Sequence, residues 1–272
     1  MHMDPHPFDT AIRLAPAGEN AYSGATSPAY ANMVGPFGGI TCAVLLNAVL
    51  VHPQRQGEPV SLTVNFAAPV ADGPFGIEAR PARTNRSTQH WVMQLVQQGA
   101  VVATASAVFA VRRETWSAAE AEAPRDMPAP STLPRMPATG RPAWVRCYDF
   151  RFMEGELAGS FDGREQAHAR SRLWVRDEPP RPLDFASLAA LCDSFFPRIF
   201  LRRRAFVPVG TVSLTTFFHA DSALLAGQSE RHVVGTARAM SYRNGYFDQS
   251  AEVWSDAGQL LASSHQVVYY RE

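Results

Sequence analysis

The sequence contains no lysine, so all 25 of its basic residues are arginines, and 25 acidic residues balance them to a formal net charge of zero. A neutral chain without an extended basic tract lacks the general electrostatic attraction that nucleic-acid-binding domains show for phosphates. We therefore expect no nucleic-acid partner.

Cysteine is also scarce. Cys42, Cys147 and Cys192 are odd in number, far apart and without a CxxC spacing, which argues against a disulfide framework and a zinc site. We expect no metal and no cofactor. The first residues lack the basic start and apolar run of a signal peptide, and no stretch approaches ~18 uninterrupted apolar residues. These features predict a cytoplasmic protein without a membrane span.

A length of 272 residues with 46% hydrophobic content suits one large domain or two modules of about 130 residues. The element pattern favours two modules. A Gly-rich segment, 35–39, precedes an apolar stretch at 40–51 that predicts a buried helix. Strands are predicted at 60–66, 75–80, 87–97 and 101–111, separated by turn residues.

An Ala- and Pro-rich stretch without sustained periodicity follows, and it predicts a connector over residues 117–143. The chain would then divide into an N-terminal module at 1–116 and a C-terminal module at 144–272. In the second module we predict one helix over 183–201. Strands are predicted at 148–152, 171–176, 209–219, 232–242, 246–255 and 260–271.

The two predicted modules share an internal repeat. The segments 60–66 (VSLTVNF) and 212–218 (VSLTTFF) agree at five of seven positions, and each follows a predicted helix. The last strands align as well, because Gly99, Ala103 and Arg112 fall on Gly258, Ala262 and Arg271 at a constant offset. We infer an internal duplication.

Duplicated halves need not stay equivalent, and polar residues kept in only one half mark candidate chemistry. Thr211 aligns with Pro59, and Gln266 aligns with Ala107. Asp193 lies among apolar residues of the second predicted helix, where burial would remove its solvation. A hydroxyl and an amide could hold this carboxylate and a water together, so that Asp193 acts as a general base. Taken singly, each residue fits a solvated helix edge or an ordinary strand position as well.

Two further groups are candidates for substrate binding. Gly38 and Gly39 precede a helix and could supply backbone N–H groups to a developing oxyanion, or could simply allow close helix packing. Arg202, Arg203 and Arg204 could meet phosphates through charge-assisted hydrogen bonds, although a solvated basic turn is the more common explanation.

Over most of its length the sequence resembles the bacterial acyl-CoA thioesterase II family of double-hotdog proteins. The resemblance rests on six segments in order: 35–39, 59–69, 97–109, 191–197, 211–219 and 258–271. It implies a fold of the α+β class, with two fused antiparallel sheet modules wrapped around central helices. It also implies hydrolysis of an acyl-CoA by a water that an Asp, a Thr and a Gln activate, and the matching residues here are Asp193, Thr211 and Gln266.

The match has departures and leaves alternatives. Ser213 and Leu214 stand where better-known members carry an acid and a His. The chain has no Gly-x-Ser-x-Gly elbow, which argues against a serine hydrolase. An enoyl-CoA hydratase of the hotdog type and a non-catalytic acyl-CoA binding protein remain as alternatives, and a homo-oligomer of double-hotdog subunits stays open.

Overall fold

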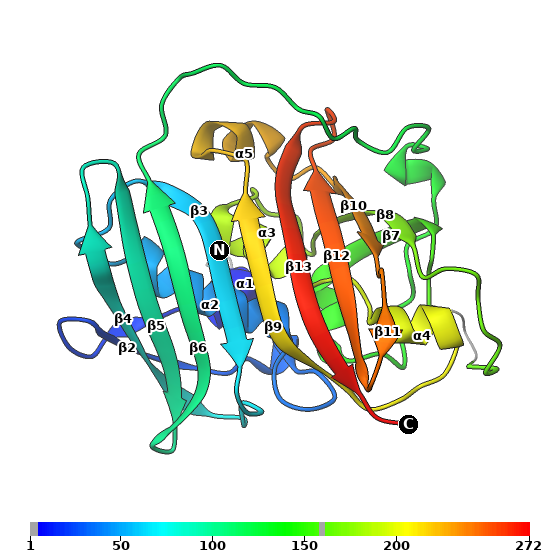
Figure 1. The fold of residues 1–272 in the computed structure, drawn as a ribbon, viewed down its shortest axis with the longest axis horizontal. Coiled ribbons are helices and arrows are strands. Elements are labelled where there is room, and N and C mark those ends of the chain that lie inside the picture. The colour runs from blue at the N-terminus through cyan, green and yellow to red at the C-terminus, as the bar shows by residue number, and fades with distance from the viewer. Residues whose placement is uncertain (1–4, 158–160) are drawn as a thin grey trace.

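A computed structural model describes residues 5–157 and 161–272. Within these residues the strands form one 13-stranded antiparallel sheet in the order β1-β2-β4-β5-β6-β3-β9-β13-β12-β10-β8-β7, with β11 paired to β12. The central helices lie together on one face of the sheet (Figure 1). The predicted α+β class is therefore confirmed.

The elements have the following bounds. The helices are α1 (Pro7–Ala11), α2 (Gly38–Leu50), α3 (Phe185–Leu191), α4 (Arg198–Arg203) and α5 (Ser222–Gln228), with short 3-10 turns at Pro28–Tyr30, Pro130–Thr132 and Ala143–Cys147. The strands are β1 (Ala15–Pro16), β2 (Ala21–Ala25), β3 (Glu58–Phe66), β4 (Pro74–Thr84), β5 (Thr88–Gln97), β6 (Ala100–Ala110), β7 (Tyr148–Glu154), β8 (Ser171–Asp177), β9 (Val209–Phe218), β10 (Val233–Arg238), β11 (Tyr242–Arg243), β12 (Tyr246–Trp254) and β13 (Leu260–Tyr270).

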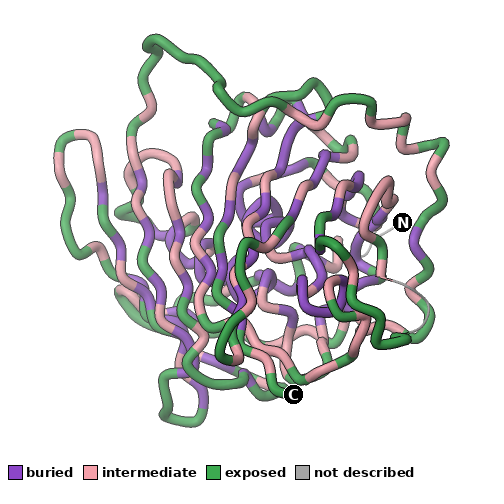
Figure 2. The backbone as a smooth tube through the Cα atoms, turned by 45° about the vertical axis from the view of Figure 1, so that its right-hand side comes forward, coloured by how far each residue is buried: buried purple, intermediate pink, exposed green. Residues whose placement is uncertain are grey.

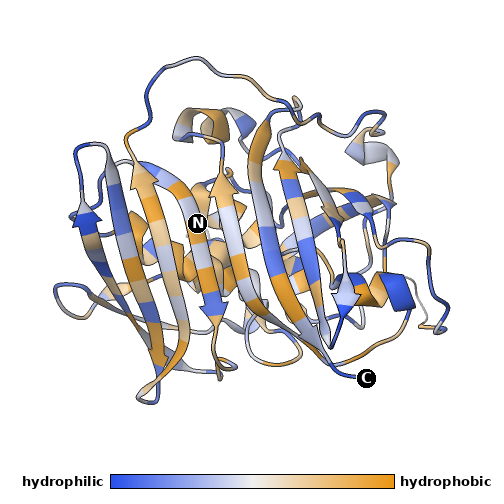
Figure 3. Ribbon diagram, viewed as in Figure 1, coloured by the Kyte–Doolittle hydropathy of each residue, from blue (hydrophilic) through white to orange (hydrophobic). Residues whose placement is uncertain are grey.

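The two central helices are buried because they carry almost no polar residues. α2 is apolar on nearly all sides, and such a helix must pack inside the protein. Every residue of α3 is buried, and the side chain of Asp184 caps its first turn by accepting a hydrogen bond from the Ser187 N–H at 2.8 Å. The apolar helices stand out in Figure 3, and Figure 2 shows the same region as buried. No helix of the described ranges is long and apolar enough to cross a membrane.

The middle of the sheet has a local two-fold relationship. β3 and β9 pair antiparallel, and Thr63 lies opposite Thr215 with the two hydroxyl oxygens 3.0 Å apart. These two threonines occupy the same position in the internal repeat. From this pair outward, β6, β5, β4 and β2 follow β3 on one side, and β13, β12, β10 and β8 follow β9 on the other.

The strand registers agree with the repeat found in the sequence. Leu62 pairs with Ala107 in the first half, and Leu214 pairs with Gln266 in the second. The register shifts at corresponding places in both halves, where Val60 and Val212 are the extra residues of a bulge. Thr211 therefore lies just before a bulge, where the strand is locally bent.

Two predicted elements are each divided in two. The strand predicted over 232–242 forms β10 and the short β11, and residues 239–241 between them are not in a strand. The single helix predicted over 183–201 is divided, because α3 ends at Leu191 and α4 begins only at Arg198. Pro197 explains the break, since a proline disfavours helical backbone at the residue before it. Asp193 therefore lies in a turn between two short helices. The strands of each half do not form a simple meander in chain order, because β3 pairs with β6 and β9 pairs with β13.

A long connection joins the halves. Residues 111–129 contain neither helix nor strand and arch over one end of the sheet (Figure 1). The connection is anchored where Trp174 Nε1 donates a hydrogen bond to the Pro128 carbonyl at 2.8 Å. The division into modules 1–116 and 144–272, with 117–143 as linker, stays a prediction.

Candidate active site

Asp193 lies where two helices meet. It follows the C-terminal end of α3, and its backbone N–H donates to the Ala190 carbonyl at 3.1 Å. Its carboxylate faces the N-terminus of α2, so closely that a Cβ atom on Gly38 would lie 2.6 Å from Oδ2. The backbone of Gly39 supplies a hydrogen bond to the same carboxylate. The positive end of the α2 dipole thus faces the carboxyl group of Asp193.

The structure brings all three sequence-predicted polar residues together in one chain of hydrogen bonds. The Nε2 of Gln266 donates to Oδ1 of Asp193 at 3.3 Å, and the hydroxyl of Thr211 donates to Oε1 of Gln266 at 3.1 Å. Because Thr211 occupies the amide oxygen, the amide nitrogen is directed at the carboxylate. Gln266 therefore connects strand β13 to the turn that follows α3.

The surroundings of Asp193 favour its neutral form. Protein atoms crowd the carboxyl, although the residue keeps a partly exposed surface, and this desolvation raises the pKa of Asp193 to about 7. The hydrogen bonds from Gln266 and Gly39 act in the opposite direction. A carboxylate with a pKa near 7 can both accept and return a proton at neutral pH, as a general base must.

The neighbouring thiols are poor nucleophiles. Burial raises the pKa of Cys192 to about 12 and the pKa of Cys42 well above its ordinary value. Only the thiolate form attacks a carbonyl efficiently. Neither thiol is therefore a candidate nucleophile at this site, and the carboxyl of Asp193 stays the candidate catalytic group.

The two glycines have a packing role in addition to their place beside Asp193. A Cβ atom on Gly39 would lie 2.6 Å from the Ala190 carbonyl oxygen and 2.4 Å from the ring of Phe37. Glycine thus allows the start of α2 to approach the end of α3. Close helix packing and a role as N–H donors are compatible for Gly38 and Gly39. The close packing is what brings the start of α2, with the N–H of Gly39, to the carboxylate.

The three consecutive arginines stand apart from this chain of contacts. Arg202 pairs with Glu165 at 2.7 Å, Arg203 with Glu272 at 2.6 Å and Arg204 with Asp162 at 3.2 Å. In the described residues no hydrogen bond or ion pair joins them to Asp193, Thr211 or Gln266. A role for Arg202–Arg204 in phosphate binding stays a prediction.

Aromatic side chains that we did not assign to the site lie next to it. Phe37, just before the glycines, stacks on Trp144 with ring centroids 4.2 Å apart, and Phe196, three residues after Asp193, lies 5.9 Å from the same indole. The Trp144 Nε1 donates to Asn32 at 3.3 Å. One tryptophan therefore contacts both the loop before α2 and the turn after α3.

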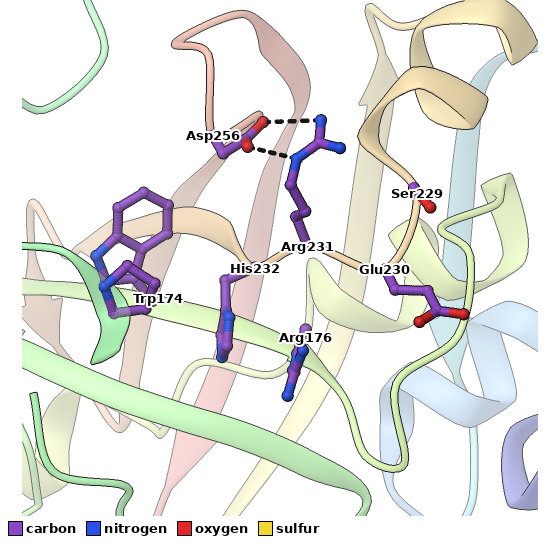
Figure 4. Close-up of a pocket in the computed structure, with 8 residues that line it drawn as sticks. Trp174, Arg176, Ser229, Glu230, Arg231, His232 and Asp256 are labelled. Carbon is purple, nitrogen blue, oxygen red and sulfur yellow. Dashed lines mark hydrogen bonds and ion pairs between the residues drawn. The ribbon is translucent and has the colours of Figure 1, made fainter. Parts of the chain in front are cut away.

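Two surface pockets lie elsewhere. One, of about 390 Å³, is lined by Trp174, Arg176, His232 and the bidentate pair Arg231–Asp256 (Figure 4). A second, of about 430 Å³, opens over strands β7, β8, β10 and β12. Neither lining includes a member of the hydrogen-bonded trio. Across the described chain, no three His, Cys, Asp or Glu residues are grouped to hold a metal ion.

Two family models match the chain in succession. Residues 27–110 match an acyl-CoA thioesterase N-terminal domain, and residues 121–270 match an acyl-CoA thioesterase C-terminal domain. No curated protein matches the sequence significantly.

Solved structures match the fold of nearly the whole chain. A conserved protein of unknown function with a hot dog fold, from Alicyclobacillus acidocaldarius, is 47% identical with a TM-score of 0.93 over 99% of both chains. A candidate thioesterase II from Thermobifida fusca is 21% identical, with a TM-score of 0.84 over 97% of both chains. An acyl-CoA thioesterase II from Mycobacterium marinum is 18% identical, with a TM-score of 0.76 over 97% of this chain and 98% of that one.

The two latter likenesses are likenesses of fold, and with the first they confirm the predicted double hotdog. Since the C-terminal model alone covers more than half of the sequence, the chain belongs to the acyl-CoA thioesterase family of double-hotdog proteins.

Proposed function

We propose that the protein hydrolyses an acyl-CoA thioester to a carboxylic acid and free CoA, with Asp193 as the general base that activates water. One observation carries this proposal. The partly exposed carboxyl of Asp193 lies at the N-terminus of α2, accepts a hydrogen bond from Gln266 and has its pKa raised to about 7. Family membership supports the substrate class.

In the proposed reaction, ionised Asp193 takes a proton from a water while the water oxygen bonds to the thioester carbon. The carbon–sulfur bond of the resulting tetrahedral intermediate then breaks, and the proton on Asp193 passes to the CoA sulfur. This transfer restores the carboxylate and needs no acyl-enzyme. The second amide N–H of Gln266 is suited to holding the water, and the Thr211 hydroxyl keeps that amide oriented by donating to its Oε1.

The oxyanion needs its own donors. As the first residue of α2, Gly38 has an N–H that the helix itself cannot satisfy, and the helix dipole favours negative charge there. Gly39 already donates to Asp193. We therefore assign the main oxyanion contact to Gly38, with Gly39 holding the base.

Arg202–Arg204 remain our proposed contacts for the CoA phosphates, and each guanidinium would exchange its carboxylate partner for a phosphate. Arg203→Gln should raise the KM for an acyl-CoA and leave its kcat unchanged. The same acyl group carried on N-acetylcysteamine, which lacks phosphates, should keep its KM in that variant. Equal changes for both substrates would exclude phosphate contact.

The alternatives give different products. A hydratase would consume the double bond of an enoyl-CoA without releasing thiol, and neither α3 nor α4 carries the His that such an enzyme pairs with its acid. A binding protein would retain CoA thioesters unchanged. Purified protein should therefore be incubated with acyl- and enoyl-CoAs while free thiol, enoyl absorbance and bound CoA are followed together. Thiol release supports hydrolysis. Loss of the enoyl absorbance without thiol release, or retention of the CoA thioester unchanged, overturns it.

A further inference from the structure

Arg198 is a buried cation without a buried anion. Its side chain is 1% exposed, and desolvation lowers its pKa to about 10. No carboxylate of the described residues lies within ion-pair distance of its guanidinium. Charged side chains are rarely buried unless they are paired with an opposite charge. Other interactions must therefore offset the cost of burying the Arg198 guanidinium.

The hydrogen bonds of Arg198 converge on the turn that carries Asp193. Its Nε donates to the Phe196 carbonyl at 2.9 Å, and its Nη2 donates to the same oxygen. Its Nη1 reaches the Ala169 carbonyl at 3.0 Å and the Ser171 hydroxyl at 2.8 Å, on the segment that enters β8. The planar guanidinium therefore fixes the turn against the sheet, a geometry that a lysine cannot reproduce.

Gln249 completes this arrangement from the neighbouring strand. Its Oε1 accepts from Arg198 Nε at 3.1 Å, and its Nε2 donates to the Phe195 carbonyl at 3.3 Å. Gln249 on β12 lies directly opposite Gln266 on β13, and both side chains are buried. Two paired glutamines thus contact one turn, Gln266 at the Asp193 carboxylate and Gln249 at the backbone two residues later.

The turn needs such partners because it belongs to neither helix. The carbonyls of Phe195 and Phe196 lie between α3 and α4, where no regular helical hydrogen bond is available to them. Buried carbonyls are almost always paired, and here a cation and an amide supply the pairs.

We propose that Arg198 and Gln249 are positioning residues that hold the 193–197 turn, so that the Asp193 carboxylate stays in contact with Gln266 and the α2 N-terminus. This inference rests on the proposed function for its effect on rate, and on geometry alone for its effect on Asp193. Displacing a base by about 1 Å can lower turnover by ~10²-fold.

Two variants and one matched control test the proposal. Arg198→Lys keeps the positive charge and loses the planar guanidinium. Gln249→Met keeps a similar side-chain volume and loses the amide. Arg151→Lys is the control, because Arg151 also holds two backbone carbonyls, those of Pro130 and Leu133, but in the linker region. All three should lower the Tm. Only the first two should lower kcat, by roughly 10- to 100-fold with little change in KM.

A second readout does not depend on activity. The pKa of Asp193, followed by NMR of carboxyl-¹³C-labelled aspartate, should fall toward the ordinary value in Arg198→Lys and Gln249→Met as the loosened carboxylate gains water. It should stay unchanged in Arg151→Lys. The proposal is overturned if all three variants lose Tm alike while the pKa of Asp193 stays where it is. A wild type that releases no thiol would refute the proposed function, and the NMR titration would still decide the role of the turn.

Discussion

The side-chain amide of Gln266 donates to the carboxylate of Asp193 at 3.3 Å, and this contact joins the sheet to the turn after α3. These residues are 73 positions apart in the chain. Their contact exists because β13 runs past the point where the two central helices meet. An amide on the sheet therefore holds the carboxyl of Asp193, which lies in the helical layer.

Thr211 should act through Gln266. Removing the amide in Gln266→Met should lower kcat by roughly 10- to 100-fold, the range for losing a hydrogen bond to a charged group. Thr211→Val removes only the donor that orients the amide, so its effect should be smaller. Steady-state kinetics of the double variant should match Gln266→Met alone, because the two side chains form one chain of contacts. Fully additive losses would show that Thr211 acts on the water independently of the amide.

The raised pKa of Asp193 predicts a conflict between function and stability. The folded protein, with this pKa at about 7, holds a proton that the unfolded chain releases near pH 4. Stability should therefore fall as pH rises between these values, and Asp193→Asn should escape that loss. Urea unfolding should show Asp193→Asn gaining stability relative to wild type from pH 4 to pH 8. Other titrating groups, such as Asp177 with its pKa at about 6, are common to both proteins and cancel. A difference that does not vary with pH would contradict the assigned pKa.

Gly38 should tolerate no side chain in an active protein. The methyl group of Gly38→Ala would lie 2.6 Å from Oδ2 of Asp193 and must displace the carboxylate, so we expect kcat to fall by on the order of 10²-fold. Gly227→Ala is the matched control. Gly227 lies near the end of α5, and a Cβ atom added there meets no other atom within 4 Å. That variant should keep full activity and gain up to about 1 kcal/mol of stability. Near-normal kcat in Gly38→Ala would remove the α2 N-terminus from the mechanism.

The repeat at 60–66 and 212–218, together with the alignment of the last strands, predicts which residues of the two halves correspond. The pairing of Leu62 with Ala107 and of Leu214 with Gln266 agrees with that alignment. Hydrophobic patterning made this possible, because a shift of one residue would turn every side chain to the other face.

Other parts of the site could not be predicted so directly. The extended helix prediction failed at Pro197, although the proline itself was the signal of a break. Gln249 did have a signal in the sequence. It is the one polar residue among the alternating inward-facing positions Phe247, Ala251 and Val253 of its strand. The sequence gives no signal for the contacts of Arg198. A buried arginine that donates to backbone carbonyls cannot be told from a surface arginine by its sequence neighbours alone.

The central claim is that Asp193 activates the water that hydrolyses an acyl-CoA. The most direct measurement is free-thiol release from short, medium, long and aromatic acyl-CoAs by wild type and Asp193→Asn side by side, with folding of both checked by circular dichroism. We predict release by the wild type and a kcat lower by on the order of 10²–10⁴ in the variant. Equal thiol release by the two proteins would contradict a catalytic role for Asp193.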